Sequence, residues 1–433
     1  MDVAVQAAMI LFFGVAILLV IGAPISISVG IASVLAMFSI LEVDNALLTS
    51  AQRMFTGMNS FALLAIPFFI LAGVIMNNGG IAIRLVNCAK VLSGRLPGSL
   101  AHTNIVANML FGSISGSAVA AAAAVGGTMT PLQEKEGYRR EFSAAVNIAS
   151  APTGMLIPPS NTLIVYSLVS GGTSIAALFM GGYIPGILWG IGCMIVVFFL
   201  ARRFGYKSEG GVTLKQALRV FWDAIPSLLL IVIVIGGIIG GVFTATEGSA
   251  IAVVYSLLLS FLYRTIKLKD LPRILLESTK TTAIVIFLIG VSSIMSWVMA
   301  FTNIPNMIAS GLLGMTDNIF VILLIMNIVL LIVGTFMDPT PAVLIFTPIF
   351  WPIAQSFGID PVHFGIMVVF NLSIGTITPP VGPVLFVGTK VANLRIENVI
   401  RPLLPFFAVT VVVLMLITYI PQLSLFIPKL LGL

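Results

Sequence analysis

The feature that most constrains this chain is a set of long stretches without a single charged side chain. They cover residues 3–41, 54–83, 96–133, 142–201, 224–246, 281–316, 361–389 and 402–428. Each is longer than the ~20 residues that an α-helix needs to cross a lipid bilayer. Only 8% of the 433 residues are charged, against about a quarter in soluble domains, and no ten-residue alternating pattern of a membrane β-barrel occurs. The sequence therefore predicts an all-α polytopic membrane protein.

Few residues in the sequence are suited to enzymatic chemistry. The two cysteines and the two histidines are far apart, so we expect no disulfide framework, zinc cluster or haem site. The sequence has no Walker motif, nucleophile elbow or HExxH, and its acids, bases and nucleophiles do not cluster. We therefore expect neither an enzyme nor a bound cofactor. We expect His102 and His363 to be hydrogen-bonded structural residues.

The basic residues set the expected topology, because lysine and arginine accumulate on the cytoplasmic side of membrane proteins. With the N-terminus outside, the expected crossings are 3–21, 24–41, 60–77, 142–171, 174–200, 224–243, 249–263, 281–301, 362–391 and 402–420. This threading places 19 of the 21 basic residues inside, with Arg53 and Lys429 as the exceptions. Such segregation indicates a protein in a lipid bilayer and argues against a nucleic-acid partner, despite the net charge of +6. We expect the first helix to be retained rather than removed as a signal peptide.

Two apolar stretches are expected to turn back inside the membrane. Residues 96–133 lie between two basic clusters that both belong inside, and their centre holds Gly112-Ser-Ile-Ser-Gly-Ser117. Residues 318–359 behave in the same way but enter from outside. Irregular backbone at membrane depth is tolerated only where it is buried in protein or lines a cavity. The sequence therefore predicts two re-entrant helical hairpins.

The two halves of the chain repeat the same order of parts. Gly154-Met-Leu-Ile-Pro-Pro159 recurs as Gly375-Thr-Ile-Thr-Pro-Pro380 after 221 residues, and Gly112 matches Gly334 after 222. Because the first copy starts outside and the second inside, we predict two inverted-topology repeats, each with a hairpin and a proline-broken transmembrane helix. Such repeats are typical of secondary transporters whose site lies at the repeat interface.

The repeats divide the chain into six regions. These are 1–98, scaffold helices and arm of the first repeat; 99–171, its transport-domain hairpin and broken helix; 172–223, a connecting helix and cytoplasmic linker; 224–316, scaffold helices and arm of the second repeat; 317–392, its transport-domain hairpin and broken helix; and 393–433, a C-terminal helix. The amphipathic stretches 81–95 and 214–223 are expected to lie along the membrane surface. They are either simple linkers or arm helices that brace a moving part.

Asp338 is the one carboxylate deep in an apolar stretch. An acid at membrane depth is costly, so we expect it to face a partner or a bound cation. Because it precedes Pro339, it also suits the N-terminus of a helix. We therefore expect Asp338 to take part in cation binding, with helix capping as the alternative role.

Small hydroxyl residues and proline pairs surround this position. Ser113, Ser115 and Ser117 lie among glycines in the first hairpin, either as packing contacts or as ligands. The proline pairs remove backbone donors, so carbonyls near 154–157 and 375–378 lose their helical partners. Free carbonyls, hydroxyls and one carboxylate form an all-oxygen environment, which suits a hard cation such as sodium. Helix N-termini at the breaks point positive dipoles at an anionic substrate.

Five motifs together are specific. They are Gly112-Ser-Ile-Ser-Gly-Ser117, Ala151-Pro-Thr-Gly-Met-Leu-Ile-Pro-Pro-Ser160, Thr244-Ala-Thr-Glu-Gly248, Met337-Asp-Pro-Thr-Pro341 and Gly375-Thr-Ile-Thr-Pro-Pro380. In this combination the chain resembles, over essentially its whole length, the large permease subunit (DctM or SiaM) of a TRAP (tripartite ATP-independent periplasmic) transporter. The resemblance implies an elevator-type, sodium-driven carrier in the bacterial inner membrane. It also implies two partners, a periplasmic substrate-binding protein and a small four-helix membrane subunit, here on a separate chain.

The resemblance also implies site residues. Sodium ligands are expected at Ser115, Ser117, Gly154, Pro159, Gly334, Asp338, Gly375 and Thr378. Substrate contacts are expected at Ser113, Ser160, Asn161, Thr335, Thr376 and Pro380. The implied substrate is an organic acid, for which we favour sialic acid over another sugar acid or a C4-dicarboxylate.

Two other functions stay open on sequence grounds. A stand-alone ion-coupled carboxylate carrier has the same hairpins and broken helices but needs no binding protein. An ion or anion channel belongs to a different class, because it does not accumulate its substrate against a gradient.

Overall fold

The computed structural model describes residues 3–94, 96–206, 213–314, 316–379 and 381–433, all in helices, turns and connecting loops. The elements in chain order are α1 Val3–Val20, α2 Ile25–Phe38, α3 Val43–Met58, η1 Phe61–Leu64, α4 Ala65–Asn78, α5 Ile81–Ser93, α6 Ser99–Ser115, α7 Ala118–Lys135, α8 Arg140–Ser150, η2 Ala151–Met155, α9 Asn161–Val169, α10 Ile175–Phe204, α11 Leu214–Ile239, α12 Ala245–Leu262, η3 Leu268–Asp270, α13 Leu271–Phe301, α14 Ile304–Leu313, α15 Ile319–Gly334, α16 Pro339–Ser356, α17 Pro361–Gly375, α18 Pro383–Val391, α19 Ile396–Tyr419 and α20 Gln422–Leu430. The predicted all-α fold is confirmed for the described residues.

The lengths of the apolar helices confirm a polytopic membrane protein. Within the described part of the chain, seven segments are long and apolar enough to span a bilayer: Val3–Val20, Phe61–Asn78, Ile175–Phe204, Lys215–Ile239, Ala245–Leu262, Leu268–Phe301 and Ile396–Tyr419. All seven coincide with predicted crossings. The crossings at 142–171 and 362–391, which we expected to be broken at their proline pairs, are divided into shorter helices.

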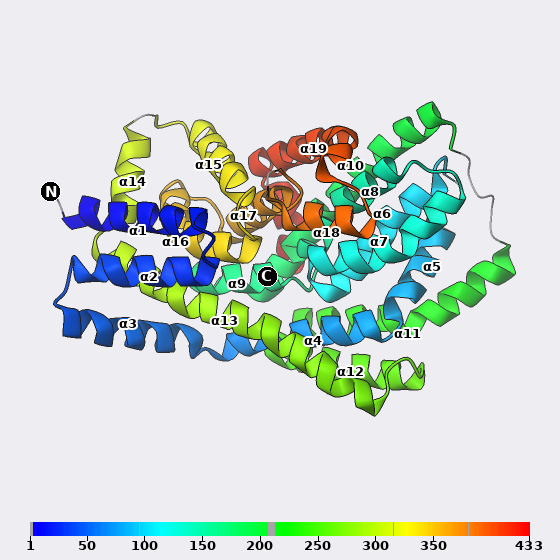
Figure 1. Ribbon diagram of the computed structural model, residues 1–433, viewed down its shortest axis with the longest axis horizontal. Coiled ribbons are helices and arrows are strands. Elements are labelled where there is room, and N and C mark those ends of the chain that lie inside the picture. The colour runs from blue at the N-terminus through cyan, green and yellow to red at the C-terminus, as the bar shows by residue number, and fades with distance from the viewer. Residues whose placement is uncertain (1–2, 95, 207–212, 315, 380) are drawn as a thin grey trace.

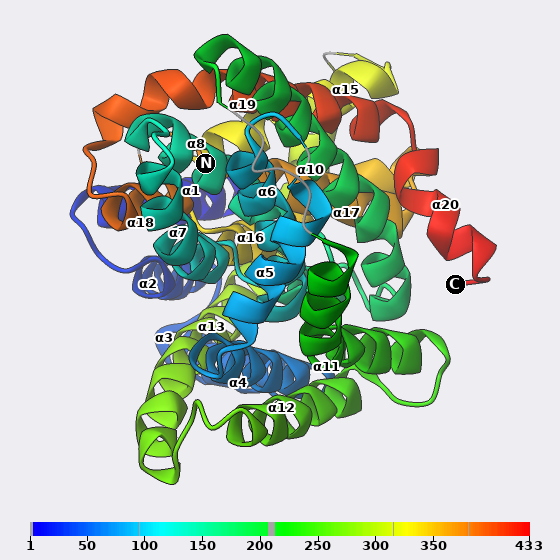
Figure 2. The same cartoon turned by 90° about the vertical axis from the view of Figure 1, so that its right-hand side faces the viewer.

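The helices form two groups. We call α1–α4 with α11–α13 the scaffold layer, and α6–α10 with α15–α20 the hairpin body. Figures 1 and 2 show α4, α12 and α13 along the bottom of the molecule, with the hairpin body above them. Helix α5 packs on both α6 and α11, and α14 packs on both α13 and α16, so these two short helices bridge the groups.

Local sequence explains where many helices begin. Thr244 starts α12 with a capping box, in which its backbone N–H donates to the Glu247 carboxylate at 2.7 Å and its hydroxyl accepts from the Glu247 N–H at 3.3 Å. Ser174 accepts from the Ala177 N–H at the start of α10. The Thr244 to Gly248 motif therefore has a structural role as a helix start.

The pattern of charged residues did not predict helix α3 or the first turns of α11. Helix α3 is not indicated by the uncharged stretches, because it contains Asp44 and Arg53, yet it packs along α13. Residues 214–223, expected as a separate surface segment, are the first turns of the continuous 26-residue helix α11. Charge-free length identifies a membrane crossing but not the amphipathic turns that extend it.

The two histidines differ in their surroundings. Both ring nitrogens of His363 make hydrogen bonds, with the Ser424 hydroxyl at 2.8 Å and the Thr418 carbonyl oxygen at 3.3 Å, which confirms its structural role and ties α17 to the C-terminal helices. His102 is equally buried, and its ring lies beside the backbone of Pro97. Its role as a hydrogen-bonded structural residue stays a prediction.

Candidate functional site

The first hairpin turns at the position that its glycine and serine motif predicts. Helix α6 ends at Ser115, Gly116 follows with a left-handed φ of 61°, and Ser117 starts α7 by accepting from the Ala120 N–H at 3.3 Å. The Ser115 hydroxyl lies 3.4 Å from both the N–H and the carbonyl oxygen of Ser117. The two serines expected to bind an ion are therefore neighbours in one tight turn.

The first long helix is interrupted at its proline pair. Helix α8 ends at Ser150, a short 3-10 helix covers Ala151–Met155, and α9 begins only at Asn161. Ser160 caps α9 by accepting from the Leu163 N–H at 3.4 Å, and its hydroxyl donates to the Met155 carbonyl oxygen. The Ser160 side chain therefore holds the break in shape.

Glycine allows the hairpin to touch this break through its backbone. A Cβ atom added at Gly112 would lie 2.4 Å from the Cα of Gly154, and one added at Gly154 would lie 2.3 Å from the Cα of Gly112. No side chain fits at either position. The hairpin turn also lies close to the break, because a Cβ at Gly116 would lie 3.0 Å from the Pro159 carbonyl oxygen and 3.4 Å from the Asn161 Nδ2.

The second half makes the same kind of contact. Helix α15 ends at Gly334 and α17 ends at Gly375, and a Cβ at Gly375 would lie 2.4 to 2.5 Å from the Gly334 backbone. The next segment of the break contacts the hairpin turn, because the Gly382 N–H donates to the Thr335 carbonyl oxygen at 3.4 Å. Each half therefore joins a hairpin to a broken helix at paired glycines.

These contacts give a direct prediction for stability. Gly154→Ala and Gly375→Ala should each lower the free energy of unfolding by about 3 kcal/mol or prevent folding, because overpacking against backbone cannot relax by a rotamer change. Thermal unfolding of the detergent-solubilised protein measures the loss. Gly127→Ala is the matched control, since a Cβ there meets nothing within 4 Å. Equal stability of all three variants would contradict the close crossings.

Unpaired oxygen atoms remain at both breaks. Among the described residues, no hydrogen-bond donor reaches the carbonyl oxygen of Pro159 or of Thr378. The Asn161 side-chain oxygen is also buried without a partner in the part of the chain that the structure describes. These oxygen atoms can accept a hydrogen bond or bind a metal ion, and no N–H or O–H of the described residues reaches them. They therefore suit a hard monovalent cation or the hydroxyl groups of a substrate.

Several oxygens that we expected to be free are occupied. The Gly375 carbonyl accepts from the Thr378 N–H at 3.0 Å, and the Thr376 carbonyl accepts from the Val384 N–H at 3.1 Å. The hydroxyls of Thr376, Thr378, Thr335 and Ser113 each donate to a carbonyl three or four residues earlier. Short turns after a helix end therefore satisfy carbonyls that a proline pair alone would leave free, and hydroxyls in helices bond to their own backbone.

Asp338 takes the capping role that we held as the alternative. It is the N-cap of α16, and its carboxylate accepts from the Thr340 N–H at 3.2 Å. Asp338 as a residue reaches the surface of the chain, and among the described residues no basic side chain forms an ion pair with its carboxylate. A carboxylate that caps a helix and stays accessible can still bind a cation, so the two roles are compatible in this geometry.

The two halves meet at the centre of the hairpin body. The Ser373 hydroxyl, on α17, lies 3.7 Å from the Met155 sulfur, at the end of the 3-10 helix in the first break. The Tyr166 hydroxyl, on α9, donates to the Pro361 carbonyl oxygen at 2.8 Å. The two broken helices are therefore in contact beside the predicted residues, while Pro380 lies outside the described residues.

Buried asparagines at this site were not foreseen. The Asn108 amide nitrogen, on α6, donates to the side-chain oxygen of Asn147 at 3.1 Å and to the Ser150 hydroxyl at 2.8 Å, both on α8. In the second half, the Asn371 amide nitrogen donates to the Asn327 side-chain oxygen at 2.7 Å. These bonds hold each hairpin to its broken helix. A buried amide side chain needs a hydrogen-bond partner, so the asparagines in the charge-free stretches could have been singled out from the sequence.

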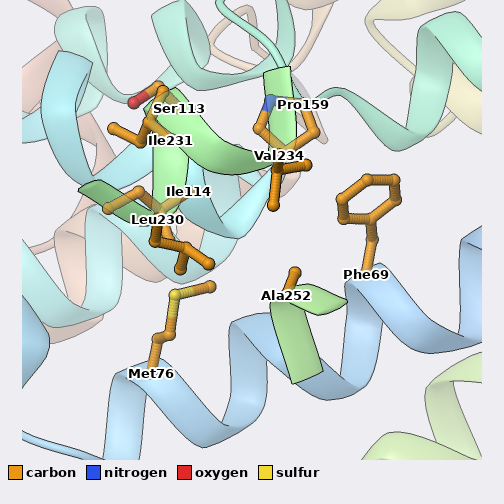
Figure 3. A pocket seen from close by; sticks show the side chains of 9 residues that line it. All are labelled: Phe69, Met76, Ser113, Ile114, Pro159, Leu230, Ile231, Val234 and Ala252. Carbon is orange, nitrogen blue, oxygen red and sulfur yellow. The ribbon is translucent and has the colours of Figure 1, made fainter. Parts of the chain in front are cut away.

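The hairpin body meets the scaffold layer in an apolar pocket. Figure 3 shows Ser113, Ile114 and Pro159 of the hairpin body opposite side chains of three scaffold helices. The scaffold residues are Phe69, Met76, Leu230, Ile231, Val234 and Ala252. The first hairpin and first break therefore lie directly against α4, α11 and α12.

Comparisons with known proteins agree with this architecture. The model of the family "Tripartite ATP-independent periplasmic transporter, DctM component" matches residues 12–423. An uncharacterized protein of Salmonella typhimurium, YgiK, is 58% identical, and the match covers 97% of each chain. The isethionate TRAP transporter permease protein DctMQ of Oleidesulfovibrio alaskensis is 41% identical, over 96% of this chain and 66% of that protein. The sialic acid TRAP transporter large permease protein SiaM of Vibrio cholerae is 38% identical, over 96% and 97%.

A solved structure supports the fold. The YdaH transporter of Alcanivorax borkumensis has a TM-score of 0.65 with 13% sequence identity, and the match covers 89% of each chain. Together with the family match, the structure defines a multi-pass transporter subunit of the bacterial inner membrane and not an enzyme. The chain belongs to the family of DctM components, the large permease subunits of tripartite ATP-independent periplasmic transporters.

Proposed function

We propose that this subunit carries an organic acid into the cell, driven by a sodium gradient. The observation that carries the proposal is the pair of matched breaks, each joined to a hairpin at two glycines and each with an unpaired carbonyl oxygen. Sodium binds oxygen ligands, and the carboxylate of Asp338 in the second hairpin is proposed to complete one of the two sites. We assign the ion to the set Ser115, Ser117, Gly154, Pro159, Gly334, Asp338, Gly375 and Thr378.

The substrate is proposed from the chemistry of the breaks and from the relatives. Helices α9 and α18 begin at the two breaks, so their positive N-terminal dipoles favour an anionic group there. Two relatives are named for organic anions, isethionate and sialic acid. We propose an organic acid and keep sialic acid as the first candidate, ahead of another sugar acid or a C4-dicarboxylate. The proposed contacts are Ser113, Ser160, Asn161, Thr335, Thr376 and Pro380.

Two protein partners belong to the proposal. The family is named for a tripartite, periplasmic system, which fits a substrate-binding protein and a small four-helix membrane subunit beside this chain. The relative named DctMQ is longer, since this chain spans 66% of it, and its name fits a permease joined to a second component. We propose that this subunit works with both components.

The movement is proposed to be an elevator. The hairpin body holds both hairpins and both broken helices, while the scaffold layer meets it through apolar side chains. Two inverted-topology repeats, related by the matched glycine contacts, would place the site between them near the bilayer midplane. Under this proposal, the hairpin body carries ion and substrate across while the scaffold layer stays fixed.

Uptake by the reconstituted system tests the function. Proteoliposomes with this subunit and its small partner, given the binding protein and labelled sialic acid, isethionate or a C4-dicarboxylate, should accumulate one of them only under an inward sodium gradient. Accumulation without the binding protein would favour the stand-alone carrier. Flux that never exceeds equilibrium would favour the channel, and accumulation that ignores sodium would contradict the proposed coupling.

A further inference from the structure

Gly73, on scaffold helix α4, lies directly against the turn of the first hairpin. A Cβ atom added there would lie 3.3 Å from the Ser115 carbonyl oxygen and 3.5 Å from the Ser115 Cα. This spacing is tight enough that the hairpin backbone would have to move for a larger side chain. Gly73 is therefore a point where the scaffold layer touches the backbone of a proposed ion-binding residue.

The surroundings of this contact are closely fitted and apolar. In Figure 3, Ile114 and Pro159 face Phe69 and Met76, which lie on α4 on either side of Gly73. The one polar side chain in this lining, Ser113, donates to a carbonyl of its own helix. Apolar contacts lack the directional bonds that would fix one register, so they permit one surface to leave another.

The second hairpin meets the scaffold layer in a different way, because its helix α16 packs on α13. At the first turn, Ile114 and Ser115 are 4% and 5% exposed. Near the second turn, Phe336 is 57% exposed and Val381 is 41% exposed. In the predicted repeats, 281–301 is the third crossing of the second half as 60–77 is of the first, so α13 is the counterpart of α4, and its Gly290 packs on methionines of α3. Among the described residues, the backbone contact of Gly73 with the first hairpin turn therefore has no counterpart at Gly290, although α16 packs on α13.

We propose that Gly73 is a positioning residue for transport, which seats the first hairpin on the scaffold layer in one end state of the cycle. The inference rests on the proposed elevator function and deepens it. A side chain at this position would disfavour the seated state, while the ion site inside the hairpin body would stay intact. Because transport must pass through both end states, a shift in their balance slows it.

The test compares Gly73→Val with a matched variant of another scaffold glycine. Gly236, on α11, has nothing within 4 Å of an added Cβ, so Gly236→Val adds the same side chain without a contact. Gly73→Val should lower the sodium-dependent uptake rate about tenfold, the size expected from overpacking one contact. Its melting temperature should still rise in sodium as much as that of the wild type. Gly73→Ala, the smaller change, should show an intermediate rate.

A second measurement, the yield of a cross-link, detects the contact between the scaffold layer and the first hairpin and does not depend on transport. With cysteines introduced by Met76→Cys and Ile114→Cys, a short bifunctional thiol reagent should join the scaffold layer to the hairpin, and Gly73→Val should reduce the yield. Full uptake or an unchanged yield in folded Gly73→Val protein would overturn the proposal. So would loss of the sodium-induced rise, since Gly73 would then act on the ion site. If the wild type shows no sodium-dependent uptake, the proposed function fails, and the cross-linking yield still decides the role of Gly73.

Discussion

Asp338→Asn is expected to stop sodium-driven uptake while the permease stays folded. Asparagine is as good an N-cap as aspartate, so the start of α16 keeps its hydrogen bond from the Thr340 N–H. The change removes only the charge. A charge-assisted contact is worth about 3 kcal/mol, which is about a hundredfold in ion affinity. Initial uptake rates at fixed sodium, with membrane amounts matched by immunoblot, measure the effect.

The chain supplies a matched control for this variant. Asp360 also precedes a proline and also caps a helix, because its carboxylate accepts from the Val362 N–H at 2.8 Å. Asp360→Asn removes the same charge from the same local motif outside the hairpin turn, so its uptake should be normal. Asp338→Ala additionally loses the cap, at about 1 kcal/mol of stability. Normal sodium-dependent uptake by Asp338→Asn would remove Asp338 from the ion site.

A reversible thiol cross-link across the apolar pocket is expected to stop transport. Figure 3 shows the Met76 side chain pointing toward Ile114 and Leu230. Cysteines at Met76 and Ile114 would join the scaffold layer to the first hairpin, so the hairpin body could not move. Uptake should fall to background after cross-linking and recover on reduction. The parent protein for these cysteine pairs should have Cys88 and Cys193 replaced by alanine, since both are buried free thiols.

The same pocket provides the control for the cross-link. Met76→Cys with Leu230→Cys joins α4 to α11, both in the scaffold layer, and should leave uptake unchanged. A block by both pairs would mean that the reagent harms the protein in general. Undiminished uptake with the Met76 and Ile114 pair fully joined would contradict the elevator movement, whatever the ion.

The breaks in the helices are the part of the site that sequence predicts well. Two successive prolines remove two neighbouring backbone donors and favour a break, and α8 and α17 both end before their proline pairs, whereas the single Pro185 stays inside α10. Likewise the glycines of the first hairpin motif permit a left-handed turn, which Gly116 adopts. These signals are local, and therefore a single sequence reveals them.

The remaining features depend on partners far away in the sequence. The pairing of Gly112 with Gly154 follows from how two helices cross, and that geometry is not encoded in either motif alone. The same holds for the bond from Asn108 to Asn147. The exposure of Asp338 also depends on packing: sequence places it in an apolar stretch, but the hairpin turn brings it to the surface of the chain.

Sodium binding at the hairpins is the central claim, and thermal unfolding tests it most directly. The purified wild type and Asp338→Asn are melted in sodium chloride and in choline chloride at equal ionic strength. A ligand that binds only the folded state stabilises it by about 2.7 kcal/mol at a hundred times its Kd. The melting temperature of the wild type should therefore rise in sodium, and that of Asp338→Asn should rise much less. Identical melting of the wild type in the two salts would contradict sodium coupling and point to Asp338 as a proton-binding group.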